Sequence, residues 1–378
     1  MKNNKISSLV FNSFTNDSRV LKEAITLKNN GFNISIVAHL DSGLLNNEIV
    51  EGVRVLRVSF LDRKTASITT KVIAYLKYIH QAIKLTKDSD FIHAHDLNTM
   101  PIAVYIKLFL NKSVKIIYDA HEYETQMNNL SKKGKKIMYF FEKRLIKYAD
   151  KIITVSHSIA LEYKKLYPTI ETPSLILNCP NYTEISKGNK FREKFKLKDE
   201  VTIFLYQGSL NKGRGLEIIV KVFKEISNKK NVLVMMGYGN LEDYAREQSA
   251  KEENIYFHEA VSPHELMDYT SSADVGIATI ENSCLSYYYC LPNKMFEYIM
   301  AEIPIIVSNL PEMKKIVRTE KIGVVLKKNS SSGILKAITE INQLDIKVLK
   351  SNLKKTKKKY NWQQQEKELL SIYNNLRE

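Results

Sequence analysis

The sequence predicts an α/β protein that contains two doubly wound parallel sheets. Its 378 residues are enough for two domains, each with its own core. Along both halves, short apolar runs alternate with segments of helical periodicity, which is the pattern of parallel sheets flanked by helices. Several predicted strands end in polar or glycine-rich loops, and open parallel sheets place their ligands at that edge.

Composition limits the class of protein. Apolar residues at 44% and charged residues at 26% are typical of a soluble globular protein. No apolar run approaches the roughly 20 residues that span a bilayer, and the N-terminal apolar run is too short for a signal peptide. Cys179, Cys284 and Cys290 show no metal-ligand spacing, so we expect reduced thiols and a cytoplasmic protein. A formal net charge of +16 favours an anionic partner: a phosphate-bearing substrate, a nucleic acid or a membrane surface.

Strands and helices are expected to alternate through the first half. The helix predicted at 18–30 is amphipathic and ends before Gly31, a common stop residue. The other predicted elements are strands at 5–11, 32–38, 91–96, 114–119 and 151–156, a β-rich stretch at 49–59 and a long helix at 68–86.

His93 and His95 end one of these strands and invite interpretation as metal ligands. Alternate strand residues share a face, so both imidazoles could meet one ion. No third ligand is evident in the sequence, and we therefore expect structural roles for both histidines and no metal site.

Residues 131–151 are predicted to form a cationic amphipathic helix. Eight Lys or Arg residues oppose two acids, a net of +6, and aromatic and aliphatic residues lie between them. Its N-terminal edge carries Lys132, Lys133, Lys135 and Lys136. A solvated basic face is the simplest interpretation. Nucleic acid is not the expected partner, because no recognised nucleic-acid-binding motif accompanies the charge.

A turn around Asn178-Cys179-Pro180-Asn181 predicts the end of the first domain. A strand at 201–206 then leads through a loop with Gly208, Gly213 and Gly215 into a helix at 216–227. Glycines between a strand and a helix let the backbone approach a phosphate. The later elements are strands at 231–236, 254–258, 274–280 and 322–326, and helices at 241–251, 263–272, 311–318 and 332–342. The lysine cluster at 347–359 is expected to be solvated.

The stretch from Ser286 to Ser308 combines a tyrosine-rich loop, a helix and a short apolar strand. Asn293 is predicted to be the helix N-cap, and Glu297 to lie in the first turn. A carboxylate there can accept two hydroxyl hydrogen bonds, which suits a ribose. The alternative is an acid that stabilises the helix dipole or is solvated.

This stretch resembles the C-terminal signature of the retaining GT-B glycosyltransferases of glycosyltransferase family 4. Members usually carry two glutamates eight residues apart, then a helix and a strand of the form P-[IV]-[IV]-[AV]-S. Glu297 matches the second glutamate and residues 303–308 match the strand, while the first glutamate is replaced by Tyr289. The L-P-N-K-x-F-E-Y form resembles a subgroup without that glutamate. In the family's G-R-L-x-x-x-K-G loop, Arg214 falls on the lysine and Ser209 on the arginine.

The resemblance implies a GT-B fold, with two Rossmann-like domains facing a central cleft. The implied bounds are 1–182 for the acceptor domain, 183–359 for the nucleotide-sugar domain, and 360–378 for a helix that crosses back. The implied reaction transfers a sugar from a nucleotide sugar, with UDP expected by family habit, to an acceptor hydroxyl with retained configuration. The leaving phosphates would be stabilised without a metal or cofactor.

The resemblance also assigns roles to individual residues. The expected donor-binding residues are Gly208, Arg214, Asn293, Lys294 and Glu297, and the expected catalytic residues are His121 and Arg214. A family histidine follows the strand equivalent to 114–119, and His121 matches it. Arg19 is a candidate phosphate contact, since the family loop before the first helix reaches the donor. Tyr289 is a candidate sugar contact.

Acceptors in this family are often glycans or lipid-linked, in the synthesis of cell-surface polysaccharides or glycoconjugates. A lipid-linked acceptor would bring the protein to an anionic inner membrane surface through Lys132, Lys133, Lys135 and Lys136. Two alternatives stay open. One is a GT-B relative without transferase activity, such as a UDP-sugar epimerase or an inactive scaffold. The other is a basic nucleic-acid-binding protein.

Overall fold

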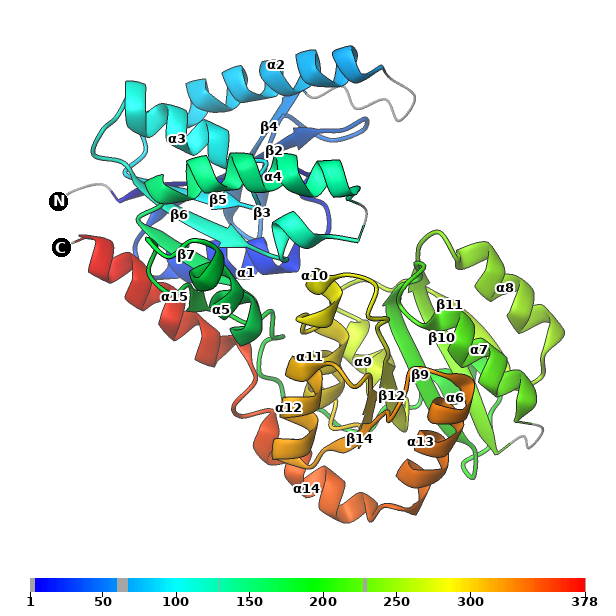
Figure 1. Ribbon diagram of the computed structural model, residues 1–378. Helices are drawn as coiled ribbons and strands as arrows, with labels where there is room; N and C mark the ends of the chain where they lie inside the picture. Colours follow the sequence, from blue (N-terminus) through cyan, green and yellow to red (C-terminus); the bar gives the residue numbers. More distant parts are fainter. Residues whose placement is uncertain (1–3, 60–66, 129, 227–229, 378) are drawn as a thin grey trace. The chain divides into compact units, whose positions relative to one another are not determined.

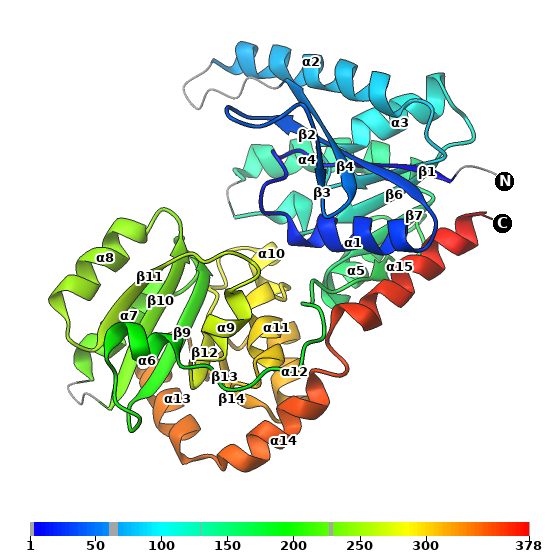
Figure 2. The same cartoon turned by 180° about the vertical axis from the view of Figure 1, so that it is seen from behind.

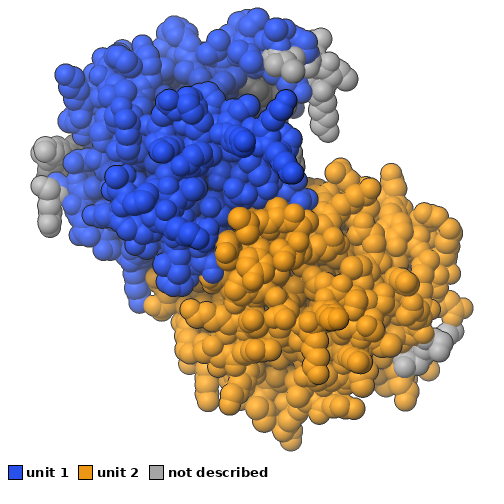
Figure 3. Space-filling view, in the orientation of Figure 1, with its two compact units in different colours: residues 1–176, 366–378 blue, residues 177–365 orange. Residues whose placement is uncertain are grey.

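A computed structural model describes residues 4–59, 67–128, 130–226 and 230–377. The chain forms two compact units, shown in Figure 3. Unit 1 comprises Met1–Ile176 and Glu366–Glu378, and unit 2 comprises Leu177–Gln365. The domain boundaries expected from the sequence lay after residues 182 and 359, whereas the two units divide after residues 176 and 365. The first three residues and the expected end of a helix at 227 lie outside the described residues.

Unit 1 contains a mostly parallel sheet, shown in Figure 1. Among the described residues its order is β3-β4-β2-β1-β5-β6-β7-β8, and only β3 and β4 pair antiparallel. The strands are β1 (Lys5–Leu9), β2 (Asn33–Leu40), β3 (Asn47–Val50), β4 (Val53–Ser59), β5 (Phe91–His95), β6 (Lys115–Ala120), β7 (Lys151–Thr154) and β8 (Ser174–Leu175).

The β-rich stretch predicted at 49–59 is a hairpin of two strands. Val50 pairs with Val53 across a two-residue turn formed by Glu51 and Gly52. Both turn residues have positive φ, 49° and 74°. Two-residue turns with positive φ at both positions match the twist of antiparallel strands, which explains the sharp reversal.

The helices of unit 1 cover both faces of its sheet. They are α1 (Ser18–Asn29), α2 (Ile68–Thr86), α3 (Met100–Phe109), α4 (Lys132–Leu145) and α5 (His157–Leu166), with short 3-10 turns η1 (Glu124–Gln126) and η2 (Ile146–Tyr148). In Figures 1 and 2, α2, α3 and α4 lie on one side of the sheet. The opposite side carries α1 and the terminal helix α15 (Trp362–Arg377).

The terminal helix packs against unit 1 through buried polar contacts. Thr26 of α1 donates to Glu366 at 3.0 Å, and the Tyr373 hydroxyl lies 3.0 Å from Nδ1 of His93. The first residues of α15 belong to unit 2, where the Trp362 amide donates to the Pro180 carbonyl at 2.8 Å.

The predicted cationic helix at 131–151 ends earlier, because α4 stops at Leu145 and η2 follows. Its Glu142 is buried and accepts hydrogen bonds from three tyrosine hydroxyls. Tyr118, Tyr163 and Tyr167 donate at 2.7, 2.8 and 2.6 Å. These bonds fix the inner face of α4 on β6 and α5, so the opposite face of the helix remains exposed.

Unit 2 contains a parallel sheet whose order, among the described residues, is β11-β10-β9-β12-β13-β14. Its strands are β9 (Thr202–Ser209), β10 (Asn231–Tyr238), β11 (Ile255–Glu259), β12 (Val275–Ala278), β13 (Ile305–Val307) and β14 (Gly323–Val325). The strand order reverses between β9 and β12. In doubly wound sheets the crevice at the carboxyl ends of such strands is the usual ligand site.

The helices of unit 2 are α6 (Lys190–Phe195), α7 (Leu216–Glu225), α8 (Glu242–Lys251), α9 (Leu266–Thr270), α10 (Leu285–Tyr288), α11 (Asn293–Met300), α12 (Pro311–Glu320), α13 (Ser331–Gln343) and α14 (Ile346–Thr356). The sheet packs on α7 and α13 through fully buried residues such as Phe204, Phe223 and Ile277. Strands covered in this way are nearly continuous apolar runs, which is why the sequence predicted them well.

Two local expectations in unit 2 were wrong. The helix predicted from residue 263 begins only at Leu266, and the Ser262 hydroxyl before it donates to the Glu265 carboxylate at 2.7 Å. The lysine cluster at 347–359 is not wholly solvated. Lys357 is buried and forms ion pairs with Glu302 and Glu184 at 2.6 and 3.0 Å. Among the helices that the structure describes, none is long and apolar enough to cross a membrane.

Candidate functional site

The carboxyl ends of β9 and β10 in unit 2 approach each other closely. Gly208 has a φ of +96°, and a Cβ atom added at Gly237 would lie 1.9 Å from the Gly208 carbonyl oxygen. Glycine is therefore required at Gly237, and the backbone of Gly208 is open enough to meet a ligand. The same edge of the sheet leads into the loop before α7.

That loop delivers the N-terminus of α7. Gly215 has a φ of +76° and precedes the helix, and no side chain caps the first turn. A Cβ atom at Gly215 would lie 2.6 Å from Oγ1 of Thr279. The amides of the first turn carry partial positive charge, so the loop presents a suitable edge for a phosphate.

Two cations lie at this edge without a full set of hydrogen bonds. The Arg214 guanidinium stacks 4.5 Å from the Tyr287 ring, and the Lys294 ammonium lies 3.5 Å from the Tyr206 ring. Among the described residues, Nε of Arg214 and Nζ of Lys294 are buried and have no hydrogen-bond partner. Burial and the nearby Arg214 lower the pKa of Lys294 to about 7, although Glu297 opposes the shift. The positive charge of this pair is therefore incompletely compensated within the described part of unit 2.

Glu297 is held in a fixed orientation. Its Oε2 accepts from Nε2 of Gln207 at 2.5 Å, and Oε1 of Gln207 accepts from the Thr270 hydroxyl at 2.9 Å. Glu297 was expected in the first turn of α11, but it lies one turn into the helix, because α11 already begins at Asn293. The expected N-cap role of Asn293 is also wrong. Pro292 takes the cap position, and Oδ1 of Asn293 accepts from Asn178 at 3.0 Å.

Tyr289 ends the short helix α10. Its amide donates to the Leu285 carbonyl at 3.1 Å, and its ring centroid lies 5.0 Å from that of Tyr288. The half-buried side chain is thus part of an ordered loop. A hydroxyl at this position differs from the carboxylate of the family signature because it carries no charge.

A second group of polar residues lies at the carboxyl ends of β5 and β6 in unit 1. Asp119 is fully buried and accepts hydrogen bonds from Nε and Nη2 of Arg19, at 3.0 and 2.9 Å. Arg19 also donates to the Ile176 carbonyl at 2.8 Å and lies 3.2 Å from Glu23. Its guanidinium is only 3% exposed. In this structure Arg19 is therefore engaged inside unit 1 and is not presented to a phosphate.

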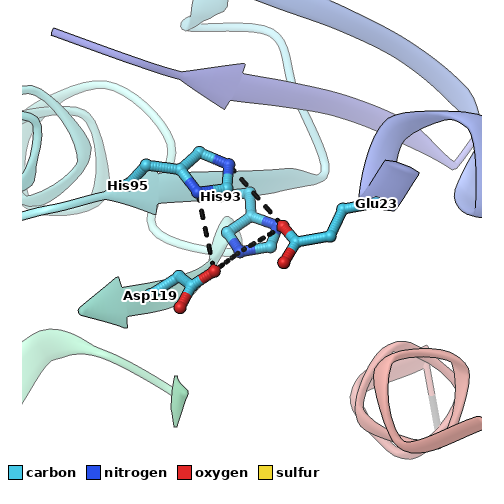
Figure 4. Close-up of side chains that lie close together, drawn as sticks. All are labelled: Glu23, His93, His95 and Asp119. Carbon is cyan, nitrogen blue, oxygen red and sulfur yellow. Dashed lines mark ion pairs between the residues drawn. The ribbon is translucent and has the colours of Figure 1, made fainter. Parts of the chain in front are cut away.

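The two strand histidines join the same cluster, as Figure 4 shows. His93 and His95 stack with ring centroids 4.2 Å apart, and both lie within 4.0 Å of Asp119 or Glu23. The further polar partners that the sequence pattern did not show are therefore the two acids Glu23 and Asp119, and one atom from each of the four side chains lies within 4.8 Å of the others.

This arrangement resembles a metal site, but Arg19 already supplies the positive charge. Burial, together with Asp119, raises the pKa of Glu23 to about 8, and burial lowers the pKa of His93 to about 3. A protonated Glu23, an ionised Asp119 and a cationic Arg19 balance one another. Arg19 and Asp119 form the ion pair at the centre of this cluster, while both carboxylate oxygens of Glu23 and Nε2 of His93 are buried without a hydrogen-bond partner among the described residues.

His121 stands at the edge of that network. Nε2 lies 3.0 Å from Nδ1 of His95 and 3.3 Å from Asp119, while Nδ1 lies 3.9 Å from Asp96. Burial opposes its protonation, but Asp96 and Asp119 raise the pKa of His121 to about 10. At neutral pH the imidazole is a cation and can donate hydrogen bonds.

Solved structures share this fold. Sucrose-phosphate synthase from Thermosynechococcus elongatus superposes with a TM-score of 0.78 at 16% identity, over 99% of each chain. HepE from Anabaena, solved in complex with UDP-glucose, gives a TM-score of 0.76 at 12% identity, over 98% of this chain and 99% of its own. At such identities the likeness establishes the GT-B fold, as the sequence predicted.

Two family models decide the class of protein. The model described as Glycosyltransferase Family 4 matches residues 18–178, and the one described as Glycosyl transferases group 1 matches residues 188–361. The chain belongs to the GT-B glycosyltransferases. A relative of the enzyme, an uncharacterized glycosyltransferase of Methanocaldococcus jannaschii, is 23% identical over 300 residues, covering 75% of each chain.

The predicted site residues of this glycosyltransferase fall into two groups. The structure brings Gly208, Arg214, Lys294 and Glu297 to one edge of unit 2, with Tyr289 and Asn293 in the flanking loop and helix. His121 and Arg19 belong to the network in unit 1.

Sequence reasoning missed the acids at the centre of the unit 1 network. Arg19 and Glu23 are one helical turn apart and share the buried stripe of α1 with Val20, Ala24 and Leu27. Charged residues on an otherwise apolar stripe signal a buried partner, since such charges are costly to bury alone. That signal identifies a pair of residues but not Asp119, which comes from a distant strand.

Proposed function

We propose that this glycosyltransferase transfers a sugar from a UDP-sugar to a hydroxyl of a glycan or lipid-linked acceptor, with retention of the anomeric configuration. The product would serve the synthesis of a cell-surface polysaccharide or glycoconjugate. The observation that carries the proposal is the pair of neighbouring cations, Arg214 and Lys294, beside the uncapped first turn of α7.

The leaving group of a nucleotide sugar explains this pair of cations. Burying cations with unsatisfied N–H groups is unfavourable unless an anion completes their hydrogen bonds. A diphosphate gains charge as the glycosidic bond breaks, so cations and helix amides aimed at it stabilise the transition state. Arg214 would replace the lysine of the family loop, and Lys294 would supply the cation that is absent at Ser209.

Glu297 would bind the ribose of the same nucleotide. Gln207 fixes one carboxylate oxygen, which sets the plane of the group before the ligand arrives. A carboxylate accepts hydroxyl hydrogen bonds that are stronger than those of a neutral amide. The choice of UDP is supported by family resemblance and by HepE, whose structure contains UDP-glucose.

In the proposed reaction His121 would donate to a donor-sugar hydroxyl or to the leaving phosphate. Its protonated state at neutral pH suits a donor and a positive charge, and does not suit a general base. The site requires no metal ion under this proposal, because side-chain cations and helix amides carry the charge on the phosphates.

The exposed face of α4 supports a membrane-bound acceptor. Ile137, Phe140 and Phe141 are each about half exposed, and Lys132, Lys133 and Lys136 are exposed beside them. Lys135 is partly covered and donates to Gln126 at 3.3 Å. Aromatic side chains next to cations favour the interface of an anionic leaflet. We therefore propose a peripheral location on the inner face of the cell membrane, with no nucleic-acid partner.

The test is UDP release from a panel of UDP-sugars, with and without glycan and lipid-linked acceptors. We expect release that depends on the acceptor, and a product whose anomeric configuration, read by NMR, matches that of the donor. Conversion of one UDP-sugar into another without UDP release would instead identify an epimerase. Absence of both reactions and of any UDP-sugar binding would indicate an inactive scaffold.

A further inference from the structure

The imidazole of His121 has two edges in different surroundings. The inner edge, Nε2, lies between Nδ1 of His95 at 3.0 Å and Oδ2 of Asp119 at 3.3 Å. The outer edge, Nδ1, lies 3.9 Å from Oδ2 of Asp96. The side chain of His121 is 20% exposed and that of Asp96 is 37% exposed. A ligand can therefore reach the outer edge, whereas fixed protein groups enclose the inner one.

Asp119 is anchored and ionised. Nε and Nη2 of Arg19 donate hydrogen bonds to the two carboxylate oxygens of Asp119, and the Asp119 side chain is fully buried. Burial alone would favour the neutral acid, but Arg19 and His121 keep the pKa of Asp119 well below its usual range. Glu23 retains its proton up to a pKa of about 8. The negative charge in this part of the network therefore stays on Asp119, beside His121.

His95 is a neutral acceptor with a defined tautomer. Burial lowers its pKa, so at neutral pH one ring nitrogen carries a proton and the other a lone pair. Nε2 lies 2.9 Å from the Ser8 hydroxyl and Nδ1 faces His121. Because a cationic His121 has a hydrogen on both nitrogens, Nδ1 of His95 must accept, and Nε2–H of His95 then donates to Ser8.

We propose that Asp119 and His95 are positioning residues for His121: they hold its imidazole as a cation whose Nε2–H points inward and whose Nδ1–H is presented to the ligand. The ligand's identity, a donor sugar or a leaving phosphate, rests on the proposed function. The orientation and charge of the ring rest on the contacts within unit 1 alone.

The balance of charge around the ring supports this assignment. Among the described residues, the groups that interact with the ring are Arg19 and Glu23 from α1, His95 and Asp96 at the end of β5, and Asp119 from β6. Next to Asp96, burial and the Asp96 carboxylate raise the pKa of Glu124 well above its usual value, so Glu124 adds no charge. With Glu23 protonated and His95 neutral, two carboxylates oppose two cations, Arg19 and His121. Loss of a proton from His121 would leave one carboxylate without a partner, which keeps the cation favoured.

Asp96 completes the outer side. Its φ of +61° is unusual for a residue with a side chain, and its Oδ1 accepts from the His121 amide at 3.1 Å. The Thr99 hydroxyl lies 2.8 Å from the His95 carbonyl and 3.0 Å from the Asp96 carbonyl, so the strained backbone is held in place. Asp96 therefore holds the backbone of His121 and places its second carboxylate oxygen 3.9 Å from Nδ1 of the ring.

NMR titration of histidine tests the proposal without knowledge of the acceptor. The full-length protein is labelled with ¹³C at histidine Cε1, and a His121→Gln variant identifies the His121 signal. We expect that signal to show the cationic shift through neutral pH and to titrate near the pKa of about 10. In Asp119→Asn the transition should fall by about 1–3 pH units, the usual effect of losing a nearby opposite charge.

Paired variants separate positioning from general stability. His95→Asn keeps a hydrogen-bond acceptor where Nδ1 of His95 stood, so His121 should still titrate at high pH. His95→Leu removes that acceptor and should lower the pKa of His121. Tyr118→Phe is the matched control, because it breaks a buried 2.7 Å bond to Glu142 from the strand position next to Asp119. The control should leave the His121 transition where it is.

Titration of His121 near 6.5 in the unaltered protein would overturn the proposal, and so would an unshifted transition in Asp119→Asn. If Asp119→Asn does not fold, the unaltered protein and the two His95 variants still decide. A parallel UDP titration keeps the two proposals apart. Absence of UDP binding refutes the proposed function and leaves the NMR result standing.

Discussion

Lys294 holds its ammonium 3.5 Å from the centroid of the Tyr206 ring, with no hydrogen-bond partner among the described residues. The ring face offers a cation–π contact but no hydrogen-bond acceptor. Burial and Arg214 lower the pKa of Lys294 to about 7, so near neutral pH the amine is only partly protonated. Binding of an anion here would favour the charged amine, so Lys294 would take up a proton when the anion binds.

UDP binding should therefore depend on pH in a defined direction. UDP bound beside Lys294 raises the lysine pKa, so binding takes up a proton above about pH 7. The terminal phosphate of UDP is already ionised there, since its second pKa is about 6. We expect the UDP Kd, measured by calorimetry, to rise about tenfold per pH unit above pH 7, up to the pKa of the complex. Lys294→Met should weaken binding and remove this slope. A slope that persists in Lys294→Met would exclude Lys294 as its source.

Arg214 should act on turnover more than on donor affinity. The diphosphate gains charge as the bond breaks, so a cation aimed at it contributes most in the transition state. We expect Arg214→Ala to lower kcat by about 10²–10³-fold, the effect of removing one preorganised donor, with a smaller change in donor KM. Arg246→Ala, which removes an exposed arginine of the same unit, should leave both constants unchanged. A rise in KM alone would mean that Arg214 binds substrate and transition state equally.

Tyr289 should contribute packing, not sugar selection. Its ring packs against Tyr288 and its backbone ends α10, so the hydroxyl is not needed for that contact. Tyr289→Phe should leave sugar preference and UDP affinity unchanged. Tyr289→Ala should lower the free energy of unfolding by roughly 0.5–3 kcal/mol in a denaturant titration. Tyr238→Ala, at a largely exposed tyrosine, is the control. A changed sugar preference in Tyr289→Phe would show that the phenol has taken over from the missing glutamate.

The exposed face of α4 should bind anionic liposomes reversibly. Each cation near an anionic surface contributes about 1 kcal/mol, and the attraction is screened within about 8 Å at physiological salt. We expect co-sedimentation with anionic but not neutral liposomes, weakened by added salt. Changing Lys132, Lys133, Lys135 and Lys136 to Ser should abolish it while UDP binding stays intact.

The matched control for that experiment lies in unit 2. Changing Lys347, Lys350, Lys354 and Lys355 of α14 to Ser removes the same charge from exposed positions. If both quadruple variants lose binding equally, the attraction depends on net charge and α4 is not a specific membrane face. Equal binding of the unaltered protein to neutral liposomes would also contradict the proposal.

Sequence pattern predicted the strands of unit 2 because buried parallel strands are apolar runs, and β9 and β10 lie close to their expected ranges. In unit 1 it missed the short strand β8 and did not separate β3 from β4. Local polar chemistry was harder to predict. The hydroxyl of Ser262 pairs with a side chain instead of capping a helix, and Lys357 is buried against two acids. These outcomes depend on which partner lies nearest after folding.

The candidate site shows the same division. Glycines and a signature motif placed Gly208, Arg214, Lys294 and Glu297 at one edge, because they lie on elements whose order the motif defines. The network around His121 was not predictable. Asp119 and Arg19 are 100 residues apart in the sequence, and no local spacing predicts a contact between them.

The most direct test of the account is an equilibrium titration of UDP into the unaltered enzyme and into Glu297→Gln. Glutamine keeps the shape of the side chain and its contact with Gln207, but loses charge-assisted hydrogen bonds worth about 1.5–3 kcal/mol each. We predict that the UDP Kd rises about ten- to a hundredfold while thermal unfolding without ligand stays the same. Equal UDP affinity in the two proteins would contradict the ribose-binding role of Glu297 and the donor site built around it.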